Sequence, residues 1–136
     1  MIGSAKRVLV VNEMKTMRVR SAEVIEQEGF TVARVCDGVQ GLYEMRQHID
    51  VVVTDHHMPR LTGLDLLLQS QMAWPDLRVI LFSDIEWEKT ELMEAREAFA
   101  WVRQSSDPGV LLSMLALAVE QEVKWKPRHA VEWVGA

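Results

Sequence analysis

The chain has 136 residues, of which 49% are hydrophobic, and its formal net charge is −5 at pH 7. This length suits one domain with a substantial core, and the acidic balance argues against a broad basic face that would bind nucleic acid. No apolar run approaches roughly eighteen residues, so we expect neither a membrane span nor a signal peptide. The lone Cys36 excludes an internal disulfide and suits a reducing cytoplasm.

Short apolar runs alternate with helical patterns along the whole chain. The runs predict strands at 6–11, 30–35, 50–54, 77–82 and 100–103. The segments between and after them carry apolar residues at helical spacing and predict helices at 14–28, 39–46, 64–72, 86–99 and 108–123. Gly29 predicts the end of the first helix, and Asp37-Gly38 predicts a turn. Pro108 suits the first turn of the last helix.

Strands and helices that alternate in this way predict a parallel sheet, covered by helices on both faces and joined by right-handed crossovers. We therefore expect one domain over residues 1–123. A tail at 124–136 follows, and Pro127 breaks any continuation of the last helix into it. Trp125 and Trp133 in this tail indicate either a segment docked on the domain or an end that binds a partner.

The stretch from Asp50 to Gly63, DVVVTDHHMPRLTG, is the most informative part of the chain. Its valines predict a buried strand, and Asp55 comes at the carboxyl end of that strand. Open α/β sheets place their ligand sites at the carboxyl ends of the strands. We therefore expect Asp55 to be a nucleophile or a metal-binding carboxylate.

Over about residues 5–123 the chain resembles a response-regulator receiver domain. The strongest likeness is DVVVTDHHMPRLTGLDLL, in particular the spacing from Asp55 to Met58-Pro59 and to Gly63. The resemblance implies a flavodoxin-like (βα)5 fold, with a doubly wound five-stranded parallel sheet in the strand order 2-1-3-4-5. It also implies a signalling module rather than an enzyme. Such a module accepts a phosphoryl group from a histidine kinase or phosphotransfer protein and uses Mg²⁺.

The resemblance assigns Asp55 as the phosphoacceptor, Ser83 as a contact of the phosphoryl group, and Trp101 as the switch aromatic that moves with Ser83. Two neighbouring positions depart from the family. Gln104 stands where a Lys would pair with the phosphoryl group, and a Gln can donate a hydrogen bond but carries no charge. Asp84 stands where the family has a small residue, and its carboxylate beside a phosphoryl group is electrostatically unfavourable.

The metal-binding positions depart as well. The resemblance implies that Mg²⁺ is held by Glu13, Asp55 and the backbone carbonyl of His57, with a weak contribution from Asn12. Asn12 and Glu13 replace the acidic pair of the family, and we expect weakened Mg²⁺ binding because this ion needs near-ideal octahedral oxygen ligands. A zinc site at His56 and His57 is disfavoured, since adjacent side chains point opposite ways and no third ligand is close in sequence. A charged His57 beside the carboxylates would partly replace the missing Lys.

Structural alternatives stay open for the same residues. Asp55 is otherwise an inert carboxylate at a strand end, and Glu13 a loop residue that faces solvent. Ser83 is otherwise the cap of the helix that follows it. Trp101 is otherwise a packed aromatic at the edge of the sheet.

The sequence favours a stand-alone, cytoplasmic receiver of a phosphorelay that signals through protein contacts and binds neither nucleic acid nor membrane. The resemblance implies that its downstream protein, or a second copy, binds the face of the fourth helix, fifth strand and fifth helix, where Trp87 and Trp101 are candidates. The alternative is a pseudo-receiver, a protein-interaction module that works without phosphate. A phosphatase of the haloacid dehalogenase kind is disfavoured, since His57 stands where that family has a second Asp.

Overall fold

The computed structural model describes residues 6–120, which contain one five-stranded sheet in the order β2-β1-β3-β4-β5. Neighbouring strands are parallel throughout this sheet. The strands are β1 (Arg7–Val11), β2 (Thr31–Val35), β3 (Val51–Thr54), β4 (Arg78–Phe82) and β5 (Ala100–Val102). The strand order implied by the resemblance is confirmed.

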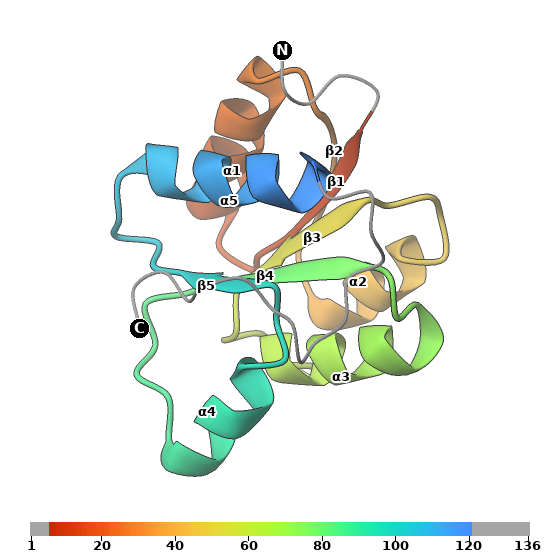
Figure 1. Cartoon of the computed structure of the whole chain (residues 1–136), viewed down its shortest axis with the longest axis vertical. Helices are drawn as coiled ribbons and strands as arrows, with labels where there is room; N and C mark the ends of the chain where they lie inside the picture. Colours follow the sequence, from red (N-terminus) through yellow and green to blue (C-terminus); the bar gives the residue numbers. More distant parts are fainter. Residues whose placement is uncertain (1–5, 121–136) are drawn as a thin grey trace.

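Helices cover both faces of the sheet. They are α1 (Lys15–Gln27), α2 (Gly38–Glu44), α3 (Gly63–Ala73), α4 (Lys89–Ala95) and α5 (Pro108–Glu120). Figure 1 shows α1 and α5 on one side of the sheet, and α2, α3 and α4 on the other. This is the doubly wound, flavodoxin-like arrangement that was predicted.

Each face of the sheet has its own core, because alternate residues of a strand point to opposite sides. Val8 of β1 belongs to the cluster with Ile25 of α1 and Leu115 of α5. Leu9, the next residue, belongs to the cluster with Leu66 of α3. With both faces covered, the central strand β3 is buried at every position. This explains why its sequence is a continuous apolar run rather than an alternating one.

Two predicted boundaries have clear causes. Gly29 has a φ of 94°, a left-handed conformation that favours glycine, and it ends α1 as predicted. The predicted turn at Asp37-Gly38 is instead the start of α2. The Asp37 side chain accepts a hydrogen bond of 2.8 Å from the Gln40 N–H, so it caps a helix that begins at Gly38.

The helix predicted at 86–99 is too long at both ends, because α4 covers only Lys89–Ala95. At its start, the Glu88 N–H donates to Oε1 of Glu91 at 3.1 Å, which satisfies a group at the N-terminal end of the helix. At its end, the N–H of the buried Phe99 donates to a β4 carbonyl at 2.8 Å and leads the chain into β5. Strand pairing and burial therefore override the helical pattern.

No helix within residues 6–120 is both long enough and apolar enough to cross a membrane. The predicted tail at 124–136, with Trp125 and Trp133, lies outside the described residues, as does the predicted extension of the last helix to 123.

Candidate functional site

The carboxyl ends of four neighbouring strands meet at one edge of the sheet. Val11 pairs with Thr54, Thr54 with Leu81, and Leu81 with Trp101. The residues that follow these strands are Asn12 and Glu13 after β1, Asp55 after β3, Ser83 and Asp84 after β4, and Arg103 and Gln104 after β5. The fold therefore brings the predicted site residues to the same edge, although they are far apart in the chain.

Asp55 is held in place by the main chain around it. Its N–H donates to the Val11 carbonyl at 3.0 Å, which continues the pairing of β3 with β1. Its Oδ1 accepts a hydrogen bond of 2.7 Å from the His56 N–H. Only 9% of Asp55 is exposed, and no hydrogen bond from the described residues engages Oδ2. The main chain therefore fixes the orientation of the carboxylate through Oδ1.

Gly63 makes this geometry possible. Its N–H donates to the His56 carbonyl at 3.0 Å. A Cβ at this position would lie 2.4 Å from the Asp55 carbonyl oxygen and 2.9 Å from Cα of His56. Backbone atoms cannot retreat as the end of a flexible side chain can, so glycine is required here. The interval from Asp55 to Gly63 in the sequence therefore has a packing cause.

The loop after β1 is engaged in local contacts. Asn12 is buried, and its Oδ1 accepts a hydrogen bond of 2.9 Å from the Met14 N–H. Arg18 of α1 donates through Nη1 to the carbonyl oxygens of Asn12 at 2.7 Å and of Glu13 at 3.4 Å. The Glu13 residue itself is exposed. A guanidinium therefore lies against the loop in which the resemblance implies an acidic pair.

The donor set at this edge fits Mg²⁺ only in part. The carboxylates of Glu13 and Asp55 and the carbonyl of His57 are oxygen ligands of the kind that Mg²⁺ prefers. Within residues 6–120, however, no group of three or more His, Cys, Asp or Glu side chains is arranged to hold a metal ion. A Mg²⁺ site here would need main-chain carbonyls and water to complete its shell, and Mg²⁺ usually keeps several of its waters.

The adjacent histidines lie in different surroundings. His57 is exposed, whereas His56 is only 6% exposed. The His56 ring meets the Trp87 ring edge-on with centroids 4.9 Å apart, and its Nε2 lies 3.6 Å from Oε2 of Glu91. Burial lowers the pKa of His56, although the nearby Glu91 carboxylate opposes the shift. The influence predicted for His57 on the pocket stays a prediction.

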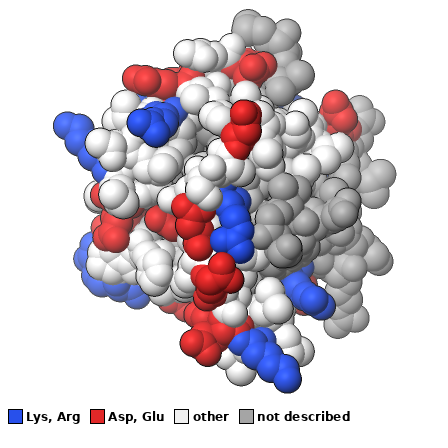
Figure 2. All heavy atoms as spheres, turned by 90° about the vertical axis from the view of Figure 1, so that its left-hand side faces the viewer, with Lys and Arg blue, Asp and Glu red and all other residues white. Residues whose placement is uncertain are grey.

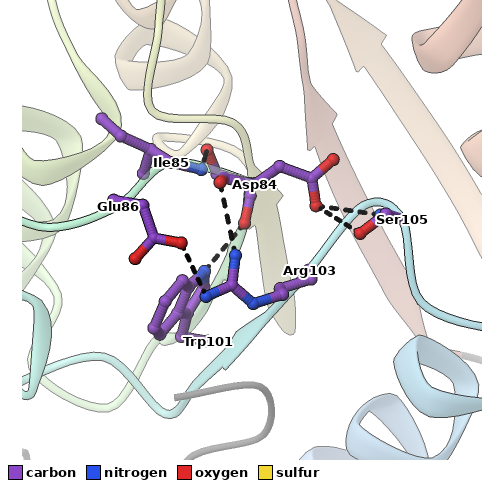
Figure 3. A network of polar contacts seen from close by, with 7 residues as sticks. Asp84, Ile85, Glu86, Trp101, Arg103 and Ser105 are labelled. Atoms are coloured by element: carbon purple, nitrogen blue, oxygen red, sulfur yellow. Dashed lines mark hydrogen bonds and ion pairs between the residues drawn. The ribbon is translucent and has the colours of Figure 1, made fainter.

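Ser83 and Trp101 are in direct contact (Figure 3). Trp101 is buried, and its indole Nε1 donates to the Ser83 carbonyl at 2.8 Å. The hydroxyl Oγ of Ser83 accepts a hydrogen bond of 3.3 Å from the Ile85 N–H. The alternative that Ser83 caps the following helix is wrong, because α4 begins only at Lys89. Trp101 is packed at the outer strand of the sheet and is also bonded to the residue with which it was predicted to move.

Asp84 and Gln104 both form hydrogen bonds with other residues at this edge of the sheet. Asp84 Oδ1 accepts hydrogen bonds from the N–H of Ser105 at 3.0 Å and from its Oγ at 2.9 Å. Figure 3 shows this carboxylate pointing to Ser105, so it joins the loop after β4 to the loop after β5. Gln104 Nε2 donates to the Phe82 carbonyl at 2.8 Å. Both residues lie at the predicted edge, but their polar groups already have protein partners.

Arg103 places a positive charge at this edge of the sheet, and this role was not predicted from the sequence. Its guanidinium carbon lies 4.7 Å from the centroid of the Trp101 ring. It donates to the Asp84 carbonyl at 3.4 Å and to Oε1 of Glu86 at 3.3 Å, as Figure 3 shows. The positive charge that is missing at Gln104 is therefore present one residue earlier, but it is directed at the loop before α4.

Acidic side chains are prominent on the surface beside this edge. Figure 2 looks at the left-hand side of Figure 1 and shows Asp and Glu gathered in a band, with Lys and Arg beside it. The loop before α4 exposes Asp84, Glu86 and Glu88. A phosphoryl group at this edge would add negative charge to a region that is already acidic.

Sequence reasoning missed the contacts made by His56, Glu91, Arg18 and Arg103. Only His56 carried a signal, since it directly follows Asp55. The other three are ordinary charged residues of helices and strand ends, and their partners lie in other elements.

Comparison with known proteins identifies the family. A family model described as the response regulator receiver domain matches residues 8–115. The chain therefore belongs to the response-regulator receiver domains, which are the signalling modules of two-component systems.

Individual relatives agree with this assignment. Chemotaxis protein CheY of Pseudomonas aeruginosa is 30% identical over 96 residues, which are 68% of this chain and 77% of that protein. The CAI-1 autoinducer sensor kinase/phosphatase CqsS of Vibrio cholerae is 29% identical over 116 residues, which are 82% of this chain but 17% of that protein. The chain spans only 17%, 23% and 9% of the first three curated relatives that it matches.

Solved structures show the same fold. A response regulator receiver domain protein from Clostridium thermocellum has a TM-score of 0.76 at 25% identity, over 85% of this chain and 94% of that one. The response regulator TrrA of Thermotoga maritima, in complex with Mg²⁺-BeF, has a TM-score of 0.77 at 23% identity, over 83% of this chain and 98% of that one. The second likeness is evidence for the fold alone.

Proposed function

We propose that this receiver accepts a phosphoryl group on Asp55 from the phosphohistidine of a kinase or phosphotransfer protein. The supporting observation is the geometry of Asp55, whose Oδ1 is held by the His56 N–H at the carboxyl end of β3. In this step a carboxylate oxygen forms a bond to phosphorus while the P–N bond of the donor breaks, and the imidazole leaves with the electron pair.

Mg²⁺ binds this receiver more weakly than it binds receivers with an intact acidic pair. Glu13, Asp55 and the His57 carbonyl would hold it, and when bound it supplies charge neutralisation for the phosphoryl oxygens. The support for weak binding is the loop after β1, where the Asn12 amide oxygen is used by the Met14 N–H. Ser83 would contact the phosphoryl group through its hydroxyl.

The pseudo-receiver is the second candidate, and the contacts around β5 favour it. The Trp101 indole donates to the Ser83 carbonyl, and the Gln104 amide donates to the Phe82 carbonyl. A domain whose switch residues already have partners could present one fixed surface to a binding protein. In either case the output surface is formed by α4, β5 and α5 and takes a downstream protein or a second copy. Stand-alone action and a cytoplasmic location stay predictions.

Treatment with a small phosphodonor and Mg²⁺, followed by intact-mass measurement, separates the two candidates. We expect a phosphate adduct in the unchanged protein and none in Asp55→Asn. A folded protein without an adduct would support the pseudo-receiver. As a test of the metal site, Asn12→Asp combined with Glu13→Asp should lower the Mg²⁺ concentration needed for half-maximal labelling by about tenfold.

A further inference from the structure

A continuous set of contacts leads from Asp55 to the N-terminal end of α4. Asp55 Oδ1 accepts from the His56 N–H at 2.7 Å. The His56 ring places Nε2 at 3.6 Å from Oε2 of Glu91. The other oxygen of the same carboxylate, Oε1, accepts from the Glu88 N–H at 3.1 Å. Glu91 thus contacts the residue after the phosphoacceptor with one oxygen and holds the start of α4 with the other.

The His56 ring and the Trp87 ring bring together two unsatisfied polar atoms. In the described part of the chain, Nδ1 of His56 and Nε1 of Trp87 are buried and have no hydrogen-bond partner. With its proton on Nε2, the His56 ring can direct that proton to Glu91, which leaves Nδ1 as an acceptor. The indole Nε1 is a donor. In that tautomer, the His56 ring has an acceptor without a donor. The Trp87 ring, whose centroid lies 4.9 Å away, has a donor without an acceptor.

A buried polar atom without a partner is unfavourable, so a second arrangement of these rings can compete with the first. A turn of the Trp87 indole that brings Nε1 to Nδ1 of His56 would satisfy both atoms. Trp87 also contacts the Trp101 ring, with centroids 5.7 Å apart, and it belongs to the segment that leads into α4. A turn of the Trp87 indole would therefore change its contact with Trp101 at a residue two positions before α4.

We propose that His56 is a positioning residue that couples the Asp55 carboxylate to α4, through Glu91 in one state and through Trp87 in the other. The coupling itself is independent of phosphate, and its use as a response to phosphorylation rests on the proposed function. The hydrogen bond from the His56 N–H is charge-assisted while Asp55 is a carboxylate. An acyl phosphate leaves a neutral carbonyl oxygen in its place, so phosphorylation weakens this bond and releases His56 to the second arrangement.

The coupling is tested first without phosphate, by amide NMR of the full chain. Asp55→Ala removes the acceptor of the His56 N–H, and we expect the amide shifts of residues 88–95 to change. The same substitution in a His56→Phe background, which keeps a ring but loses both ring nitrogens, should leave these amides unchanged. Equal responses in the two backgrounds, or no response of α4 in either, would overturn the proposal.

A second pair of variants isolates the contact of Glu91. Glu91→Gln keeps an acceptor for the Glu88 N–H but places an amide NH2 against Nε2 of His56. We expect hydrogen exchange of the α4 amides to accelerate about fivefold. The matched control is Glu94→Gln, an exposed position on the same helix, which should leave the rates unchanged. Equal rates in the two variants would count against the proposal.

Failure of the coupling is distinguishable from failure of the proposed function. If the protein takes up phosphate and α4 responds equally with His56 or Phe at this position, the coupling is wrong and the phosphoacceptor role stands. If no phosphate adduct forms but the response of α4 to Asp55→Ala requires His56, the coupling stands and the receiver works without phosphate.

Discussion

The two halves of the functional edge differ in how far their side chains are already engaged. In the half formed by β1 and β3, the Asn12 amide oxygen accepts a hydrogen bond and the main chain holds Asp55. Within the described residues, however, Asp55 Oδ2 accepts none, and Glu13 is exposed. In the half formed by β4 and β5, polar groups of Asp84, Trp101 and Gln104 each donate to or accept from another protein group.

This difference shows that the proposed acceptor and the residues proposed to respond to it are held by different contacts. The proposed acceptor, Asp55, is a carboxylate at a strand end, and the backbone of β3 and Gly63 positions it. The response needs side chains that can exchange one partner for another. Here the polar groups of Asp84, Trp101 and Gln104 have protein partners, so a second state needs a set of contacts of comparable free energy.

The largest expected effect comes from disturbing the backbone of the β1 and β3 half. Gly63→Ala places a Cβ against the Asp55 carbonyl oxygen and Cα of His56, and we expect a loss of about 3 kcal/mol in the free energy of unfolding. Urea unfolding measures it. Gly109→Ala is the matched control, since its Cβ would meet only the side-chain oxygen of Asp107 at 3.1 Å. A similar loss in both variants would contradict the role given to Gly63.

A smaller effect is expected from removing one of the contacts in the β4 and β5 half. Trp101→Phe deletes the indole donor of the Ser83 carbonyl, and we expect a cost of about 2 kcal/mol from the lost hydrogen bond and packing. Trp87→Phe is the comparison, because it removes a buried donor that has no partner within the described residues and should cost less. Thermal unfolding compares the two. A larger loss of stability in Trp87→Phe than in Trp101→Phe would contradict the contribution assigned to the Trp101 hydrogen bond.

The smallest expected effect is the loss of folding stability when Asp37 is protonated at acid pH. Asp37 pairs with Arg60, which belongs to the turn after Asp55. The Gln40 N–H and the Arg60 guanidinium, 2.7 Å away, hold the pKa of Asp37 below its ordinary value of 3.8. Because the folded pKa is the lower one, the stabilisation is complete above pH 3.8 and is lost as the pH falls through the folded value.

Urea unfolding of the unchanged protein and of Asp37→Asn checks this prediction over a series of pH values. The difference in unfolding free energy between them should be constant near neutral pH and shrink below pH 3.8. Arg60→Gln, which leaves the cap of α2 in place, should show part of the same loss. If this difference in unfolding free energy stayed constant below pH 3.8, the charge of Asp37 would contribute nothing and only its capping hydrogen bond would matter.

The sequence by itself determined the alternation of strands and helices, the family and the position of Asp55. These features have local causes: β-branched runs, helical spacing, and a glycine that closes a tight turn at a set interval after the acceptor. The bounds of α4 were mispredicted because Glu88 to Glu91 contacts set its start and the pairing of Phe99 with β4 sets its end.

Only the tertiary structure decided which side chains surround Asp55 and the loops beside it. Arg18 against the loop after β1, Arg103 over Trp101, and Glu91 between His56 and the start of α4 each join elements that are distant in the chain. The physical reason is that these contacts depend on which faces the packed helices turn toward the strand ends. The local pattern of charges in the sequence does not determine this orientation of the helices.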